Sequence, residues 1–258
     1  MSRPNLFEVP VWDHLEQLVL EIFSQGLVAL ADETYLPRQE DFLNRRLLEC
    51  CRKSNHGLRR EGRGLPCPIF YEASNQPLAD EEAREARLRN RPDFTCGFHD
   101  DLAENYAEAD ILYTIECKRL GSPSTSSWIL NTNYVVNGIS RCEDPECGYA
   151  DGTVSGMMVG YIQSMEPAEI LAEVNDAAFI NGFNIITLSP KSWVLKSVTV
   201  LNPHAFPRRL LPSPFRLNHL WVDLRHCEFF EVSLPAQKGK KGAKRQQKTA
   251  TTKKGKNK

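Results

Sequence analysis

Two short segments carry residues whose types and spacing could hydrolyse a phosphodiester bond. Asp93 follows Pro92 at the start of one apolar segment, and Glu116 and Lys118 stand two positions apart at the end of another. Phosphodiester hydrolysis needs a divalent ion that is held by oxygen ligands, polarises the phosphate and lowers the pKa of bound water. Asp93 and Glu116 on neighbouring strands could converge on one ion. The compact ammonium of Lys118 could orient the attacking water.

A third carboxylate, from a preceding helix, would complete this site. Glu40 is the candidate because it lies in the first turn of a predicted helix. Asp41 and Glu49 are near enough in the sequence to leave this assignment open. We therefore predict a site for Mg²⁺ or Mn²⁺ whose metal ligands are Asp93, Glu116 and Glu40, with Lys118 as the fourth catalytic residue.

The segment 110–120 must be a strand for this site to form. In a strand, Glu116 and Lys118 share one face, and the apolar side chains that alternate with them form a core face. An acidic residue two positions before a lysine occurs only here in residues 1–237, where lysine is scarce: four lysines stand against 18 arginines. The alternative is structural, with Glu116 and Lys118 as a solvated cross-strand pair and Asp93 as the cap of a turn.

The surrounding pattern predicts one α/β domain over residues 1–237, with a central mixed sheet flanked by helices. The segments 91–98 and 110–121 are expected to be paired strands joined by a turn at 99–109, and residues 54–66, rich in Gly and Arg, are expected to form a loop. The predicted order is N-terminal helices at 8–53, catalytic strands at about 91–120, helices at about 130–181, including the stretch 133–165, and closing strands at about 193–232.

Charge is distributed unevenly along the chain. Residues 238–258 hold ten Lys or Arg and no Asp or Glu, which leaves 22 basic and 33 acidic residues in 1–237, a net charge of −11. Such a basic segment lacks the apolar residues needed to offset the entropy of ordering, so we expect a disordered tail. It could bind nucleic acid phosphates without sequence preference, or serve only to keep the protein soluble.

Other sequence features narrow the function further. No apolar run has the length of a membrane span or the pattern of a signal peptide, so we expect a cytoplasmic protein without membrane contact. The cysteines are scattered, and only Cys142 and Cys147 have a spacing that could supply half of a zinc site. No motif for nucleotide phosphates, a serine nucleophile or a zinc protease occurs, and no organic cofactor is expected.

The chain resembles prokaryotic members of the PD-(D/E)XK, or restriction-endonuclease-like, nuclease superfamily. The resemblance rests on Pro-Asp at 92–93, Glu-Cys-Lys at 116–118, Glu-Asp with a Leu-rich helix at 40–48, and the stretches 133–163 and 217–224. It implies a restriction-endonuclease-like core, with Asp93 and Glu116 as metal ligands and Lys118 positioning the attacking water. Glu40 matches the acidic residue that such enzymes carry on a helix.

The resemblance also implies roles for other residues and for partners. Gln163, with Tyr161 on an expected helix, could support the lysine, and Arg119 could contact a phosphate, although either could be an ordinary surface residue. His204 and His219 are expected to be structural. The expected substrate is DNA in preference to RNA, cut internally, and some relatives act as homodimers. The alternative is a non-catalytic nucleic-acid-binding or scaffold protein that retains the fold and uses the basic tail.

Overall fold

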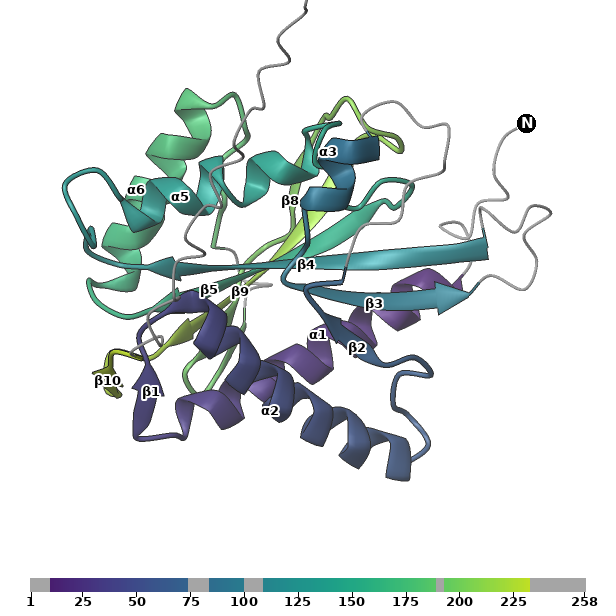
Figure 1. Cartoon of the computed structure of the whole chain (residues 1–258), viewed down its shortest axis with the longest axis horizontal. Coiled ribbons are helices and arrows are strands. Elements are labelled where there is room, and N and C mark those ends of the chain that lie inside the picture. Colours follow the sequence, from purple (N-terminus) through teal and green to yellow (C-terminus); the bar gives the residue numbers. More distant parts are fainter. Residues whose placement is uncertain (1–9, 74–83, 100–108, 189–192, 233–258) are drawn as a thin grey trace, which may run out of the picture.

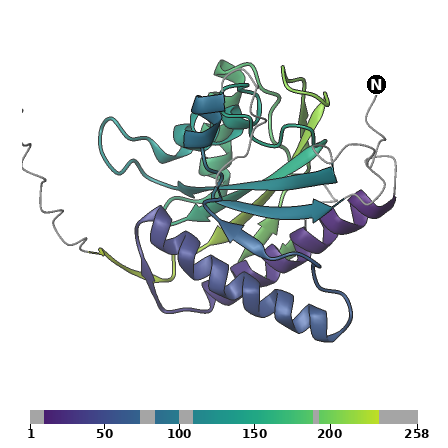
Figure 2. The same ribbon diagram turned by 45° about the vertical axis from the view of Figure 1, so that its right-hand side comes forward.

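The computed structural model describes residues 10–73, 84–99, 109–188 and 193–232, in which a mixed sheet lies between two layers of helices (Figure 1). α1 and α2 cover one face of the sheet, and α5 and α6 cover the other, as the rotated view also shows (Figure 2). This confirms the predicted sheet flanked by helices. The elements are α1 (Pro10–Ala31), β1 (Tyr35–Pro37), α2 (Glu40–Arg60), β2 (Ile69–Tyr71), α3 (Arg84–Arg89), β3 (Phe94–His99), β4 (Asp110–Leu120), α5 (Leu130–Val136), the 3-10 helix η2 (Ile139–Cys142), β5 (Ser155–Ile162), α6 (Pro167–Ile180), β6 (Trp193–Leu195), β7 (Val198–Val200), β8 (His204–Phe206), β9 (Phe215–Asp223) and β10 (Glu228–Phe230).

The main sheet has the strand order β2-β3-β4-β5-β9-β7-β6, with β8 paired to β9. β3 is antiparallel to both β2 and β4, whereas β4, β5 and β9 run parallel to one another. The predicted pairing of the two motif strands is therefore confirmed, although residues 100–108 of the expected turn lie outside the described residues. β1 and β10 form a separate parallel pair at the start of α2.

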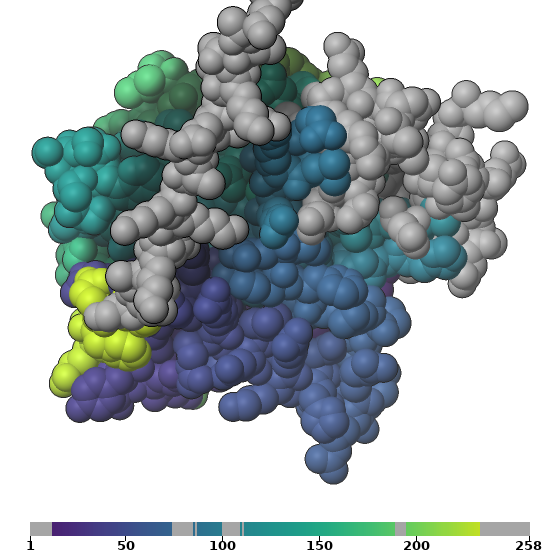
Figure 3. Space-filling model, in the orientation of Figure 1, coloured from purple at the N-terminus to yellow at the C-terminus, as the bar shows by residue number. Residues whose placement is uncertain are grey.

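Two buried clusters hold the layers together. One lies between the sheet and the α1–α2 layer and includes Phe23, Phe94 and Tyr113. The other lies under α5 and α6 and includes Tyr134 and Trp221. Burial of this apolar surface stabilises the fold by roughly 25 cal/mol per Å². In the space-filling view, α2 forms the lower part of the visible face and the teal segment around α5 forms its upper left part (Figure 3).

Two of the predicted elements are wrong. Residues 155–162 form the strand β5 and not part of a helix. Every side chain of β5 is buried, so the polar and apolar alternation that marks a strand with one exposed face is missing. A Cβ on Gly160 would lie 2.4 Å from Leu120 Cδ1 and 2.7 Å from Trp221 Cδ1, so the neighbouring side chains occupy the space that a side chain there would need.

The second error concerns the end of α2, which continues to Arg60 through residues expected to form a loop. Its buried face continues through Asn55 and Leu58, so the helical period persists past the predicted end. The Asn55 Oδ1 atom accepts a hydrogen bond from the Leu65 backbone N–H, which fastens the following turn to the helix. Gly57 lies where an added Cβ would meet no atom within 4 Å, so it interrupts no packing.

The other predictions agree with the described residues more closely. The first helix within the predicted range 8–53 is α1, and the last helix within the predicted range 130–181 is α6. No helix in the described ranges combines the length and the hydropathy of a membrane-spanning segment. The basic segment 238–258 lies outside the described residues.

Candidate active site

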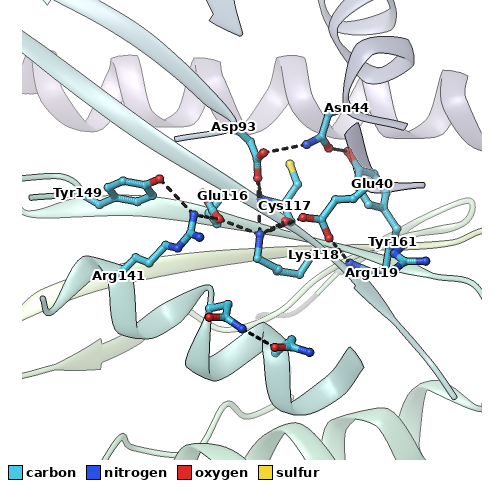
Figure 4. A network of polar contacts seen from close by, with 12 residues as sticks. Glu40, Asn44, Asp93, Glu116, Cys117, Lys118, Arg119, Arg141, Tyr149 and Tyr161 are labelled. Atoms are coloured by element: carbon cyan, nitrogen blue, oxygen red, sulfur yellow. Dashed lines mark hydrogen bonds and ion pairs between the residues drawn. The ribbon is translucent and has the colours of Figure 1, made fainter. Parts of the chain in front are cut away.

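The predicted site residues meet at one edge of β4 (Figure 4). The pairing of β3 with β4 ends at Phe94 and Ile115, whereas β4 continues to Leu120. Beyond that point the backbone N–H groups on this side of β4 have no strand partner among the described residues. Two carboxylates take them: the Cys117 N–H donates to Asp93 Oδ2 at 2.7 Å, and the Arg119 N–H donates to Glu40 Oε2 at 3.1 Å. Because β3 begins only at Phe94, the N–H groups of Cys117 and Arg119 are free of a described strand partner on this side and can bind the two carboxylates.

Asp93 is fixed by a buried polar chain that reaches two other elements. Its Oδ1 atom accepts a hydrogen bond from Asn44 Nδ2 at 2.9 Å, and Asn44 Oδ1 accepts one from the Tyr161 hydroxyl at 2.7 Å. Asn44 lies on α2 and Tyr161 on β5, and both side chains are fully buried. Because both Asp93 oxygens are held, the carboxylate has one orientation.

Glu40 is the helix carboxylate of this site. It is the first residue of α2, and its Oε1 atom lies 3.0 Å from Lys118 Nζ. The two alternatives lie elsewhere. Asp41 is exposed, and Glu49 pairs with Arg46 at the surface. The structure thus brings Glu40, and neither of its neighbours, to Asp93 and Glu116.

Lys118 lies at the centre of the carboxylates. Its Nζ atom donates to Glu116 Oε1 at 2.7 Å, to Glu40 Oε1 at 3.0 Å and to the Cys117 carbonyl at 2.7 Å, and it lies 3.9 Å from Asp93 Oδ2. Its side chain is 10% exposed. Burial alone lowers the pKa of Lys118, but the carboxylates of Glu116, Glu40 and Asp93 outweigh burial and raise it. The ammonium therefore stays charged at neutral pH.

The carboxylates repel one another despite this lysine. Burial raises the pKa of Asp93 well above its usual value, and the negative charge of Glu116 raises it further. Lys118 opposes both effects without cancelling them. Within the described part of the chain, the buried Oε2 atom of Glu116 has no hydrogen-bond partner. An unpaired buried carboxylate oxygen is costly, and it is a suitable ligand for a hard cation.

Sequence reasoning missed Asn44, Arg141 and Tyr149, and it expected Tyr161 on a helix beside the lysine and not on β5. Asn44 and Tyr161 hold Asp93, Arg141 donates from Nη1 to Glu116 Oε1 at 2.8 Å, and the Tyr149 hydroxyl accepts from the same Nη1 at 3.2 Å. Burial lowers the pKa of Arg141, but the charge of Glu116, together with smaller contributions from Tyr149, Cys147 and Asp93, outweighs burial and raises the pKa. Arg141 follows Glu116 by 25 positions and lies on η2, so no sequence spacing connects them.

The side chains of the other residues considered from the sequence do not support Lys118. Gln163 follows β5 in place of the expected helix, and its Nε2 atom donates to the Arg38 carbonyl, so it does not support Lys118. The backbone of Arg119 joins the site through its bond to Glu40. His204 and His219 lie buried on the far strands β8 and β9, with His219 Nδ1 2.8 Å from the Tyr134 hydroxyl.

The two cysteines considered for zinc lie near η2. Burial raises the pKa of Cys142 to about 12 and that of Cys147 to about 11. Cys147 Sγ donates to Asp144 Oδ2 at 3.5 Å. In the described ranges, no group of three or more His, Cys, Asp or Glu side chains is spaced to hold a metal ion by itself.

The carboxylates of the candidate active site are likewise not spaced to hold a metal ion by themselves, because Lys118 Nζ lies between Glu40 and Glu116. A metal ion would have to share these carboxylates with the ammonium. The donor types nevertheless fit a divalent ion, because they are hard oxygens and one of them, Glu116 Oε2, is buried without a partner. When all are ionised, the carboxylates of Glu40, Asp93 and Glu116 exceed the cations Lys118 and Arg141 by one negative charge.

Comparison of the chain with protein-family models, with curated proteins and with solved structures found no match.

Proposed function

We propose that this chain is a metal-dependent nuclease of the PD-(D/E)XK superfamily with a restriction-endonuclease-like core, and that it hydrolyses phosphodiester bonds in DNA. The observation that carries the proposal is the convergence of Glu40, Asp93 and Glu116 on Lys118 at the unpaired edge of β4. These groups come from a helix and two neighbouring strands, in the arrangement that the resemblance implies. A solvated surface pair would not explain why Glu116 is 2% exposed and Lys118 10% exposed.

Each side chain has a definite part in this mechanism. A divalent ion, when bound by Asp93, Glu116 and Glu40, would supply polarisation of the phosphate and activation of water. Lys118 would donate a hydrogen bond to the attacking water and balance the negative charge that develops on the phosphate. Asn44 and Tyr161 keep Asp93 oriented, so that little rearrangement is needed when the reaction begins.

The test is a cleavage assay on plasmid, linear duplex, single-stranded DNA and RNA, with Mg²⁺ or Mn²⁺ against EDTA. Lys118→Ala is expected to lower the rate by about 100-fold or more, because it removes the donor that orients the water. Lys196→Ala is the matched control, since Lys196 is an ion-paired lysine at the surface, with a side chain 63% exposed. It should cut at the wild-type rate.

Two outcomes would contradict the proposal. Cutting that survives EDTA, or that Lys118→Ala does not slow, would place the activity elsewhere. Failure of the folded wild-type protein to cut any substrate, combined with nucleic-acid binding that requires residues 238–258, would favour a non-catalytic binding protein.

A further inference from the structure

Arg141 reaches the candidate site from the opposite side to Glu40. It lies on η2, which follows α5, and its Nη1 atom bonds both Glu116 and Tyr149 (Figure 4). Its guanidinium lies over the Tyr149 ring, with Cζ 5.6 Å from the ring centroid. Tyr149 is buried, so the arginine rests on a fixed aromatic surface.

The bonds of Arg141 use only part of its hydrogen-bonding capacity. A guanidinium carries five N–H donors, and the bonds to Glu116 and Tyr149 both come from Nη1. In the part of the chain that the structure describes, Nε and Nη2 have no acceptor. Such a pair of donors forms a planar fork that matches two oxygens of a phosphate, which a lysine ammonium cannot do.

The pairing of Arg141 with Glu116 duplicates a contact that Lys118 already makes. Both cations donate to Oε1 of Glu116, at 2.8 and 2.7 Å, whereas Oε2 has no partner among the described residues. Arg141 is therefore a second cation on an oxygen that Lys118 already contacts. Any cation that bound the Glu116 carboxylate would weaken the hold of this carboxylate on the arginine.

Lys118 and Arg141, the two cations of the site, differ in their exposure to solvent. The Arg141 side chain is 32% exposed, whereas that of Lys118 is 10% exposed. Arg141 therefore contacts the buried Glu116 carboxylate and also reaches the solvent, from which a polyanion must approach. A polyanion that approaches this acidic site needs a cation at its entrance.

We propose that Arg141 binds a backbone phosphate of the substrate beside the cleaved bond, through Nε and Nη2. This inference rests on the proposed nuclease function. It names Arg141 as the residue of that active site that binds the phosphate. It makes Arg141 a substrate-binding residue and leaves the activation of water to Lys118.

The experiment combines Arg141 variants with neutral linkages in the substrate. A short oligonucleotide that the wild-type protein cuts once is made in versions that each carry one methylphosphonate at a successive linkage around the cut. Affinity is measured by fluorescence anisotropy with Ca²⁺ in place of Mg²⁺, and KM and kcat are measured with Mg²⁺. The proteins are wild type, Arg141→Ala, Arg141→Lys and Arg209→Ala.

Arg209→Ala is the matched control, because Arg209 is an exposed arginine that pairs with Glu143 directly after η2 and contacts no site residue. Arg141→Ala is expected to weaken binding of the unmodified oligonucleotide by about 10- to 100-fold, the loss expected for a charge-assisted hydrogen bond. One neutral linkage should weaken binding by the wild type to a similar extent and cause no further loss in Arg141→Ala. Arg141→Lys keeps the charge without the fork and should lie between the two.

The outcomes distinguish this inference from the function on which it rests. If every neutral linkage affects wild type and Arg141→Ala alike, or if Arg141→Ala binds as well as Arg209→Ala, Arg141 does not receive a phosphate. Should Arg141→Ala fail to fold, the same comparison is made with Arg141→Lys. If the wild type itself neither cuts nor binds any oligonucleotide, the proposed nuclease function fails first.

Discussion

Asn44 donates a hydrogen bond to Asp93 over 2.9 Å, although the two residues lie 49 positions apart, on α2 and directly before β3. The same Asn44 side chain accepts from the Tyr161 hydroxyl on β5. One buried amide therefore connects the helical layer, the motif strand and the centre of the sheet. The position of Asp93 depends on all three.

Asn44→Ala is expected to destabilise the fold by about 1–3 kcal/mol, because it removes the donor to Asp93 Oδ1 and the acceptor of the Tyr161 hydroxyl. It should also lower kcat, since Asp93 loses its fixed orientation. Asn175→Ala is the control: it breaks two bonds to the backbone of Ile186, far from the site in sequence and in fold. Urea denaturation and a cleavage assay on both variants separate the effects, and equal activities would show that Asn44 is only structural.

Removal of the central ammonium should make the stability depend on pH. Lys118→Met leaves Glu40, Asp93 and Glu116 without their shared cation, which is expected to cost about 3–5 kcal/mol at pH about 8. The pKa of Asp93 is already raised by burial and by Glu116, and it rises further when the opposing charge of Lys118 is lost, so the stability of the variant falls as pH rises and the loss is smaller at pH about 5. Urea denaturation at both pH values measures this. Lys196→Met, which breaks an exposed pair with Asp32, should change stability by less than about 1 kcal/mol at either pH.

Metal binding should raise the melting temperature more strongly as pH increases. The pKa of Asp93 is raised by burial and by Glu116, so part of the Asp93 population holds a proton that a metal ion must displace. As pH rises through this raised pKa, the stabilisation by Mn²⁺ should grow, to about 2.7 kcal/mol at a concentration 100 times the Kd. Thermal unfolding with and without Mn²⁺ measures this stabilisation.

Glu116→Gln should abolish the rise in melting temperature that Mn²⁺ causes, whereas Glu143→Gln, which alters an exposed ion pair with Arg209, should retain it. A shift that is equal in both variants would place the metal elsewhere.

Deletion of residues 238–258 tests the role of the basic tail expected from the sequence. The segment holds ten Lys or Arg, and each contact with a phosphate releases counterions. The deletion is expected to weaken nucleic-acid binding and to flatten its dependence on salt, while kcat stays unchanged. Binding isotherms at several salt concentrations measure the slope. An unchanged slope would leave the segment with a role in solubility alone.

The sequence predicted the carboxylates and the lysine of the site because strand periodicity and residue type are local properties. Asp93, Glu116 and Lys118 lie on or beside strands whose alternation could be counted, and Glu40 opens a helix with a clear apolar face. The roles of Asn44, Tyr161 and Arg141 depend on tertiary packing, so Asn44 and Arg141 were missed and Tyr161 was expected on a helix. Nothing in the spacing of a buried asparagine distinguishes it from an ordinary helix residue.

The errors in the fold have a similar cause. β5 is buried on both faces, so its sequence of small and apolar residues carries no period that separates a strand from a helix. The short strands β1, β8 and β10 are three residues each, too brief for any pattern to mark them.

The parallel pairing of β4 with β5 also affects when the site can assemble during synthesis. A nascent chain that has reached residue 120 already contains Glu40, Asp93, Glu116 and Lys118, but the parallel partner of β4 is β5, which has not yet been made. Arg141 and Tyr161 also come later in the chain. Under the proposed function, an unfinished copy would carry the reactive groups without their arrangement, and only the completed fold could cut nucleic acid.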